Sequence, residues 1–321
     1  MPESPVPRPM HRKTMTMLLA AIAALVLCAP ASANYRVGLS EQNAATFDQP
    51  PWQGLKLKRV RYIVPWDYYR GDGTAEVATF MNAARAHKQE VLVMFTARRG
   101  CYSRGKYSRS RACKAPSKKT FTTAFKKFKT AYPWVKTYAP WNEANHVSQP
   151  TSKSPKRAAD YYAAVKANCK GCTVLGADVL DQSNVKTWLK SFIRSSHNRA
   201  RVWGLHNYKD VNRKQSKGLT NVLKTVPGQV WLTETGGITT FLSSGFKTSS
   251  SRAASATKYM FRLADRFDSR RKGYKSKLTR IYVYRWWGEP AGTFDSGLVN
   301  ADGSPRPAFA QFEKYATRRL K

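Results

Sequence analysis

The chain has 321 residues, of which 42% are hydrophobic and 12% aromatic, and its 56 Lys and Arg outnumber its 19 Asp and Glu. This composition excludes a disordered chain, a collagen and a coiled coil, and the length allows one large domain or two small ones. The formal net charge of +37 indicates an anionic binding partner, such as nucleic acid, an anionic glycan or an acidic cell surface.

The first segment has the pattern of a secretory signal. Arg12 and Lys13 precede an apolar run from Met15 to Ala29, and Ala31-Ser32-Ala33 is typical of a cleavage site. The run is shorter than the roughly 20 residues of a transmembrane anchor. Leu27 is too bulky for a lipoprotein signal at Cys28. We therefore expect residues 1–33 to be removed and residues 34–321 to be secreted.

Four cysteines remain after this cleavage: Cys101, Cys113, Cys169 and Cys172. An even number in an exported protein predicts two disulfides. The local pairs 101–113 and 169–172 are the simplest of the three possible pairings. The second pair, in Cys-Lys-Gly-Cys, is also compatible with a redox motif or half a zinc site. No second Cys-x-x-Cys completes a zinc site, and the flanking residues do not resemble a redox motif, which favours a structural disulfide.

Short runs rich in β-branched and aromatic residues recur along the chain and predict strands. Segments between them have the spacing of amphipathic helices, and Ser154 before Pro155 is typical of a helix start. The segment after the first strand is the weakest helix, because 41–54 contains two prolines and a glycine. The predicted strands are Tyr35–Leu39, Val60–Val64, Val91–Phe95, Val135–Ala139, Thr173–Gly176, Arg201–Leu205, Gln229–Thr233 and Arg280–Arg285. The predicted helices are Ala75–His87, Thr120–Ala131, Pro155–Asn168, Asn184–Ser195, Ser251–Phe267 and Pro307–Arg319.

Strands that alternate with helices predict an α/β fold with a mainly parallel sheet. Eight such units within residues 34–321 fit a single (β/α)8 TIM barrel. An open doubly wound sheet is the alternative, but it would be expected to carry a glycine-rich turn after the first strand, and none is present. No linker or internal repeat divides the chain, so we expect one domain.

Two glutamates stand where a barrel of this kind has its chemistry, at the carboxyl ends of strands. Glu143 follows the fourth predicted strand and Glu234 the seventh, and they are two of only seven Glu after residue 33. Each follows an apolar or aromatic run, where an unpaired carboxylate would be costly. Hydrolysis of a glycosidic bond requires two facing carboxyl groups, one as acid and one as nucleophile or base. The alternative is that both form buried structural ion pairs.

The sequence resembles the clan A glycoside hydrolases, and in particular members like those of families 39 and 5. The segment from Trp141 to Asn145, Trp-Asn-Glu-Ala-Asn, is close to the Trp-Asn-Glu-Pro-Asn of family 39-like members, with Ala144 where proline is common. The resemblance implies a retaining mechanism in which Glu143 is the general acid/base and Glu234 the nucleophile. It also implies that Asn142 contacts the sugar 2-hydroxyl.

The same resemblance implies further substrate-binding residues. In His206-Asn207-Tyr208, the histidine would line the subsite and the tyrosine would touch the nucleophile. Arg61 would hold the nucleophile ionised, and Trp286 or Trp287 would form an aromatic floor. A structural role in the core or at the surface is the alternative for the histidine and the tyrosine, and core packing is the alternative for both tryptophans. Further aromatic and acidic residues at strand ends are candidates for sugar contacts, namely Trp66, Asp67, Asp178 and Asp181. A cap on the following helix is the alternative for Asp178 and Asp181, and we favour it for Asp181.

Other chemistries have no support in the sequence. It contains no Gly-x-Ser-x-Gly elbow, His-Glu-x-x-His, P-loop or dinucleotide motif, so we expect no cofactor and no metal. The basic, tyrosine-bearing segment 98–119 would stand beside the cleft and favours an anionic polysaccharide, uronic or phosphorylated. The alternative is a surface that is basic everywhere, fitting electrostatic adhesion to an acidic envelope.

The sequence as a whole predicts a secreted, monomeric, endo-acting glycoside hydrolase with no specific nucleic-acid partner. A non-catalytic barrel that binds carbohydrate or cell wall is the alternative.

Overall fold

The computed structural model describes residues 1–4, 35–104, 106–269, 271–289 and 294–317. The chain divides into two compact units, Met1–Ser32 and Ala33–Lys321, and the second carries all the features below. The predicted signal segment lies almost entirely outside the described residues, as do the last two residues of the final predicted helix. Among the described residues, no helix is both long and apolar enough to cross a bilayer.

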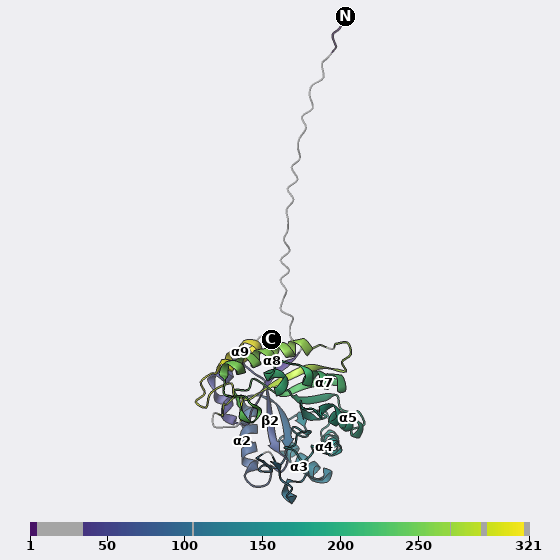
Figure 1. The fold of residues 1–321 in the computed structure, drawn as a ribbon, viewed down its shortest axis with the longest axis vertical. Helices are drawn as coiled ribbons and strands as arrows, with labels where there is room; N and C mark the ends of the chain where they lie inside the picture. The colour runs from purple at the N-terminus through teal and green to yellow at the C-terminus, as the bar shows by residue number, and fades with distance from the viewer. Residues whose placement is uncertain (5–34, 105, 270, 290–293, 318–321) are drawn as a thin grey trace. The chain divides into compact units, whose positions relative to one another are not determined.

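A parallel sheet forms the centre of the second unit (Figure 1). Its order is β7-β6-β3-β2-β1-β12-β10-β9-β8. The strands are β1 (Arg36–Ser40), β2 (Arg59–Pro65), β3 (Glu90–Thr96), β6 (Thr137–Ala139), β7 (Thr173–Val174), β8 (Asp178–Leu180), β9 (Val202–His206), β10 (Gly228–Thr235) and β12 (Ser276–Tyr284).

The two ends of this sheet are consecutive in the chain. β7 and β8 are separated only by residues 175–177, where the ladder is interrupted. Leu175 N donates to Tyr138 O of β6 at 2.9 Å, and Gly176 N donates to Val202 O of β9 at 2.8 Å. The fifth strand position therefore bridges both edges of the curled sheet. This confirms the eight predicted strands and the (β/α)8 architecture.

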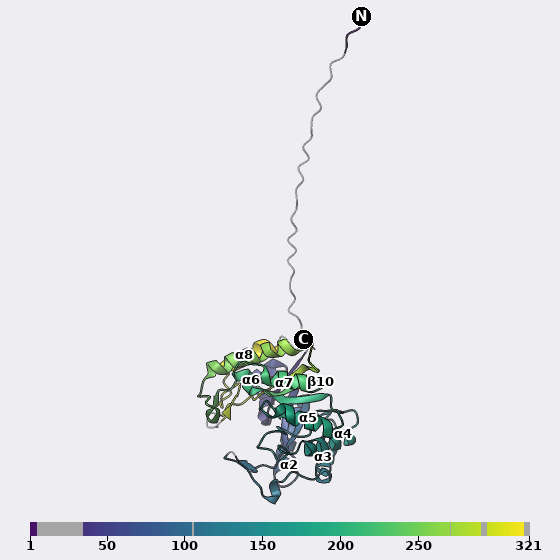
Figure 2. The same ribbon diagram turned by 45° about the vertical axis from the view of Figure 1, so that its right-hand side comes forward.

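Helices cover the outer side of the sheet, and α3, α4, α5 and α7 succeed one another along it (Figures 1 and 2). All six predicted helices are present, with ends that differ by a few residues. The Ser154 side chain caps α4 by accepting from Arg157 N, as expected from its place before Pro155. The helices are α2 (Gly73–Ala86), α3 (Lys118–Ala131), α4 (Pro155–Asn168), α5 (Val185–Ser195), α6 (Tyr208–Asn212), α7 (Lys217–Thr225), α8 (Ser250–Phe267) and α9 (Pro307–Ala316).

The prolines of the first connection have the expected effect. In place of one long helix, the chain forms the 3-10 turn η1 (Ala44–Asp48) and the short α1 (Pro50–Leu55). The helices α6 and α7 are not predicted from the sequence. Gly218 lies in the first turn of α7 and weakens its helical pattern, but Gly218 N and Leu219 N donate to the buried Asp210 carboxylate. A contact from outside the helix therefore holds its start.

The core has an inner and an outer part. Along β3, Leu92 and Met94 point into the barrel, while Val91, Val93 and Phe95 pack against the helices. Because the strand is buried on both faces, it is one continuous apolar run in the sequence.

Short strand pairs lie outside the barrel. β4 (Tyr102–Ser103) pairs with β5 (Lys106–Tyr107) just before the 3-10 turn η2 (Arg111–Cys113). Later in the chain, β11 (Thr240–Phe241) pairs with β13 (Phe294–Asp295), and the 3-10 turn η3 (Leu242–Ser244) follows β11.

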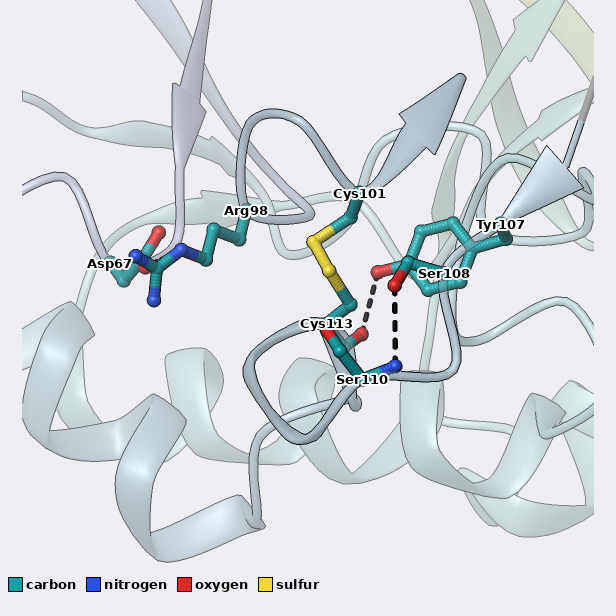
Figure 3. The surroundings of a disulfide bond; sticks show 7 residues. All are labelled: Asp67, Arg98, Cys101, Tyr107, Ser108, Ser110 and Cys113. Atoms are coloured by element: carbon teal, nitrogen blue, oxygen red, sulfur yellow. Dashed lines mark hydrogen bonds and ion pairs between the residues drawn. A yellow bond between two sulfur atoms is a disulfide. The ribbon is translucent and has the colours of Figure 1, made fainter. Parts of the chain in front are cut away.

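Both predicted disulfides are formed, Cys101–Cys113 and Cys169–Cys172. The first closes the basic segment 98–119, and within it Tyr107 Oη donates to Cys113 O at 2.7 Å (Figure 3). The same view shows Arg98 pointing toward Asp67, with 3.7 Å between Nε and the carboxylate.

Candidate active site

Glu234 and Arg61 form a buried ion pair inside the barrel. Glu234 is carried by β10, and Arg61, fully buried on β2, donates to its Oε1 at 2.7 Å and to Ser40 Oγ at 2.6 Å. Burial alone would raise the pKa of Glu234, but the positive charges of His206 and Arg61 and their hydrogen bonds lower it to about 2. The Glu234 carboxylate is therefore ionised across the neutral pH range.

His206 lies between the two glutamates at the end of β9. Its Nδ1 is 3.1 Å from Glu143 Oε1 and 3.1 Å from Glu234 Oε2, and its Nε2 is 2.8 Å from Asp178 Oδ2. Burial alone would lower the pKa of His206, but the Asp178 and Glu234 carboxylates and the hydrogen bonds to Asp178 and Glu143 raise it well above its ordinary value. These carboxylates outweigh the Arg61 guanidinium, which is 3.4 Å from Nε2. His206 is therefore a buried imidazolium that links both glutamates.

Asp178 on β8 supports both His206 and Glu143. Besides the histidine, its fully buried carboxylate accepts Glu143 N at 3.2 Å and the Thr233 hydroxyl. Gly204 makes room for it, because a Cβ at that position would lie 2.0 Å from Asp178 Oδ1. Of the two sequence interpretations of Asp178, neither a sugar contact nor a helix cap describes this role.

Glu143 follows β6 in an unusual backbone conformation. Its φ is 44°, in the left-handed region that a non-glycine residue rarely adopts, and its bonded N–H fixes it there. A carboxylate oxygen of Glu143 and one of Glu234 lie within 4.8 Å of each other. Retaining glycosidases place their carboxyl groups about 5–5.5 Å apart and inverting enzymes about 6.5–9.5 Å. Carboxylate oxygens this close fit the shorter, retaining arrangement.

The same two glutamates and His206 are close enough to reach one metal ion. Their chemistry does not suit one, however. Both ring nitrogens of His206 already face carboxylates, Nε2 that of Asp178 and Nδ1 those of the two glutamates, and Arg61 already occupies Glu234. The group is better described as a hydrogen-bonded acid–base cluster.

The two glutamates open into a cleft of about 700 Å³. Asn142 lines it, with its Oδ1 held by Arg61 Nη2 at 2.6 Å, and the Tyr208 hydroxyl donates to Glu234 Oε2 at 3.5 Å. Larger hollows of about 940 and 790 Å³ lie elsewhere, and neither contains a residue of this cluster. The cleft also has an aromatic wall, of which the sequence indicated only Tyr208, formed by Tyr208, Phe241, Phe246, Tyr284 and Phe294.

The predicted tryptophan floor is wrong. Trp286 is fully buried, packs edge-on against Trp52 and Phe309, and does not line the cleft. Its backbone N donates to Glu41 Oε2 at 2.9 Å, which fixes this turn of the chain. Tyr284, the last residue of β12, is the aromatic side chain from this strand that faces the cleft. Trp287 is half-buried and bonds Thr46 instead.

Two further expectations need correction. Trp66 does not line the cleft either, since it is buried in the core with the Arg70 guanidinium 5.7 Å from its ring centre. Asp181 does not cap α5. It lines the cleft, and its carboxylate accepts Asp210 N at 3.3 Å. Burial and the Asp210 charge raise the pKa of Asp181 to about 7.

The disulfide-closed segment stands beside the cleft, as predicted. The Tyr102 ring is 6.4 Å from that of His146, which lines the cleft. Its first two cations are already paired, Arg98 with Asp67 and Arg99 with Glu76. The cations that line the cleft come instead from the start of α6 and the residue after it, Lys209 and Arg213.

A barrel with a short-range carboxylate pair at the ends of its fourth and seventh strands defines the class of (β/α)8 glycoside hydrolases. The sequence profile described as glycosyl hydrolase catalytic core matches residues 113–312. The chain belongs to this family. No curated protein sequence matches the chain.

Solved structures of glycoside hydrolases share the fold. A family 39 enzyme from Bacteroides cellulosilyticus WH2 has a TM-score of 0.56 at 14% identity, with 89% of this chain and 64% of that chain covered. A GH5_18 protein from Streptomyces cattleya, in complex with GlcNAc, has a TM-score of 0.63 at 13% identity over 90% of this chain and 81% of that one. A xylanase from Cellvibrio japonicus has a TM-score of 0.59 at 12% identity, covering 89% and 98%. The chain thus spans less than two thirds of the length of the family 39 enzyme.

Proposed function

We propose that this glycoside hydrolase cleaves the O-glycosidic bonds of a polysaccharide by double displacement, with Glu234 as nucleophile and Glu143 as general acid/base. The observation that carries the proposal is the short distance between their carboxylate oxygens, within 4.8 Å. The ion pair of Glu234 with Arg61 supports its assignment as the group that must be ionised.

In the first step, Glu234 attacks the anomeric carbon while Glu143 gives its proton to the leaving oxygen. The glycosidic bond breaks and a glycosyl ester forms on Glu234. In the second step, Glu143 takes a proton from water, which attacks the same carbon and frees Glu234. His206, bonded to both carboxylates, keeps them in position, and Tyr208 donates to the nucleophile.

The substrate we propose is an anionic polysaccharide cut within the chain. Lys209 and Arg213 line the cleft and provide cations for carboxylate or phosphate groups, and the aromatic wall provides faces for sugar rings. The two disulfides support a secreted protein, since such bonds persist in oxidising compartments.

A second candidate function is non-catalytic adhesion to an acidic envelope. The net charge of +37, carried well beyond the cleft, favours it. Adhesion needs neither glutamate, so the two functions separate experimentally.

The deciding experiment measures reducing-end release by the purified protein from a panel of neutral and anionic polysaccharides. Glu143→Gln and Glu234→Gln should each abolish release while leaving binding in place. NMR of the first product formed should show retention of the anomeric configuration. Release that survives both substitutions would refute the assignment. Binding of several anionic polymers without any release, equal in all three proteins, would establish adhesion instead.

A further inference from the structure

A second hollow, of about 790 Å³, lies along the outer surface of α5 and the end of α7, two helices that pack side by side (Figure 2). Every charged residue that lines this α5–α7 groove is basic or a histidine: Lys186, Lys190, Arg194, His197, Lys224 and Lys275. No acidic residue lines it.

Three of these cations are spaced four residues apart on α5. Lys186, Lys190 and Arg194 therefore share one face and form a row about 12 Å long at a rise of 1.5 Å per residue. Like charges at this spacing repel and destabilise a helix. The opposite face of α5 is buried in the core through Trp188 and Phe192, so the helix does not depend on the three cations to be held in place. Stability alone therefore does not explain the row.

The surrounding sequence offers no compensating charge. Residues 182–233 contain ten Lys and Arg and a single acid, Asp210. That carboxylate is buried and bonded to the start of α7. Across the described part of the chain, none of the five Lys and Arg of the groove forms an ion pair with a carboxylate.

The larger hollow of about 940 Å³ differs in this respect. It is also basic, but its Arg59 pairs with Glu90 and its His87 with Asp48. Part of its charge is thus already neutralised within the protein. Of these two hollows, the α5–α7 groove is the one in which no Lys or Arg pairs with a carboxylate of the described residues.

The groove begins beside the catalytic cleft. Gln182 and Ser183 line the cleft, and Lys186 follows them within one helical turn. A polymer held at the glutamates and leaving the cleft past Ser183 would meet the row of cations next. Among the groove's lining residues there is no Phe, Tyr or Trp, the rings on which single-stranded nucleic acid is usually stacked. Because the neighbouring cleft is proposed to hold a polysaccharide, the position of the groove favours a glycan.

We propose that the α5–α7 groove is a second, non-catalytic site that binds a linear anionic polysaccharide, one whose sugars carry carboxylate or phosphate groups. It would hold a strand of the substrate outside the cleft and so raise the affinity of the enzyme for the polymer. One part of this proposal rests on the proposed function, namely that the strand bound in the groove is a strand of the polymer cut in the cleft. Binding at the groove itself needs neither glutamate.

The test compares two triple variants of the full protein with the same net charge. The groove variant is Lys186→Gln, Lys190→Gln, Arg194→Gln. The control is Lys258→Gln, Arg262→Gln, Arg266→Gln, which removes three exposed cations at the same spacing from α8. Binding of polygalacturonate, of a polyphosphate-bearing wall polymer, of neutral xylan and of a single-stranded oligonucleotide is measured at about 0.15 M salt, all in the Glu234→Gln background so that nothing is cut.

We expect the groove variant to bind at least one anionic polymer about tenfold more weakly and the control variant less than twofold more weakly, with neutral xylan unaffected. The midpoint temperature of thermal unfolding should be no lower in the groove variant than in the parent protein, because the repulsion among the three cations of α5 is removed. Equal losses in the two variants would overturn the proposal, since affinity would then follow net charge alone. So would tighter binding of an oligonucleotide than of either glycan, lost in the groove variant. Failure of hydrolysis in the wild-type protein would refute the proposed function and leave this binding result intact.

Discussion

Arg61→Met tests how the nucleophile is kept ionised. In the folded protein the pKa of Glu234 is lowered from 4.5 to about 2, which corresponds to about 3 kcal/mol of stabilisation of the carboxylate. His206 and Arg61 share this effect. Loss of the guanidinium leaves a buried carboxylate with one cation, so we expect its pKa to rise by more than one unit.

The consequence for activity is a shift of the acidic limb of the pH profile of kcat/KM, which reports the free enzyme. The limb should move to higher pH by more than one unit in Arg61→Met. The free energy of unfolding gives a second test of the role of Arg61. Because the folded pKa is depressed, Glu234 stabilises the fold above pH 4.5 and loses this contribution as the pH falls toward 2. Urea unfolding should show a cost of about 3–5 kcal/mol at pH 7 and a smaller one at pH 3.

Arg280→Met is the matched control, since Arg280 pairs with Glu90 away from the catalytic cluster. It should lower stability without moving the acidic limb. An Arg61→Met enzyme with an unchanged limb would refute the view that Arg61 sets the ionisation of Glu234.

Three other predictions concern the cleft and its surroundings. Tyr284→Ala should raise KM about tenfold through loss of an aromatic contact with the sugar, and Trp286→Phe should leave KM unchanged. Trp286→Ala should lower the free energy of unfolding in urea by about 3–5 kcal/mol. A rise in KM for Trp286→Phe and none for Tyr284→Ala would show that the tryptophan forms the floor of the cleft after all. Asp181, with its pKa raised to about 7, should make the protein less stable as the pH rises from about 4 to 7, and Asp181→Asn should flatten that slope in thermal unfolding; an unchanged slope would contradict the raised pKa. Replacing Cys101 and Cys113 by Ser opens a loop with a separation of 12 residues, so unfolding in urea should cost about 3 kcal/mol less while kcat is kept; a large loss of kcat would show that the loop acts in the chemistry.

The fold could be predicted because its signal is repeated. Each barrel strand is buried on both faces, so each is a short apolar run, and one ambiguous run does not change the architecture. The exceptions depend on distant contacts. α7 starts where Asp210 accepts the N–H groups of Gly218 and Leu219, and no local pattern reveals that.

The candidate site could be predicted only in part for a related reason. Glu143, Glu234, His206 and Arg61 all come from barrel strands or their ends, and parallel strands bring those ends together. Trp286 lies beyond the end of β12, where the alternation of a strand no longer determines which way a side chain points. Its position depends on its bond to Glu41, which is 245 residues away.

The charges of the molecule form two groups, one at the surface that serves substrate binding and one at the catalytic centre that serves bond cleavage. At the surface, cations dominate, but at the catalytic centre the carboxyl groups of Glu143, Glu234 and Asp178 surround two buried cations, Arg61 and His206, and His146 lies 3.8 Å from Glu143 at the mouth of the cleft. Once Glu143 has given up its proton, the three carboxylates and the two buried cations together carry one net negative charge. This is when positive charge develops on the sugar ring in its oxocarbenium-like transition state.

Salt should therefore affect substrate binding and bond cleavage differently. Exposed cations that attract an anionic polymer are screened over about 8 Å at 0.15 M salt, whereas charges buried in the barrel are screened much less. Raising the salt concentration should increase KM for an anionic polysaccharide and leave kcat nearly constant, as measured in steady-state assays from low to high salt. The KM of a neutral oligosaccharide serves as the control and should not change. A fall in kcat at constant KM would place the salt-sensitive charges in the catalytic centre and contradict this division.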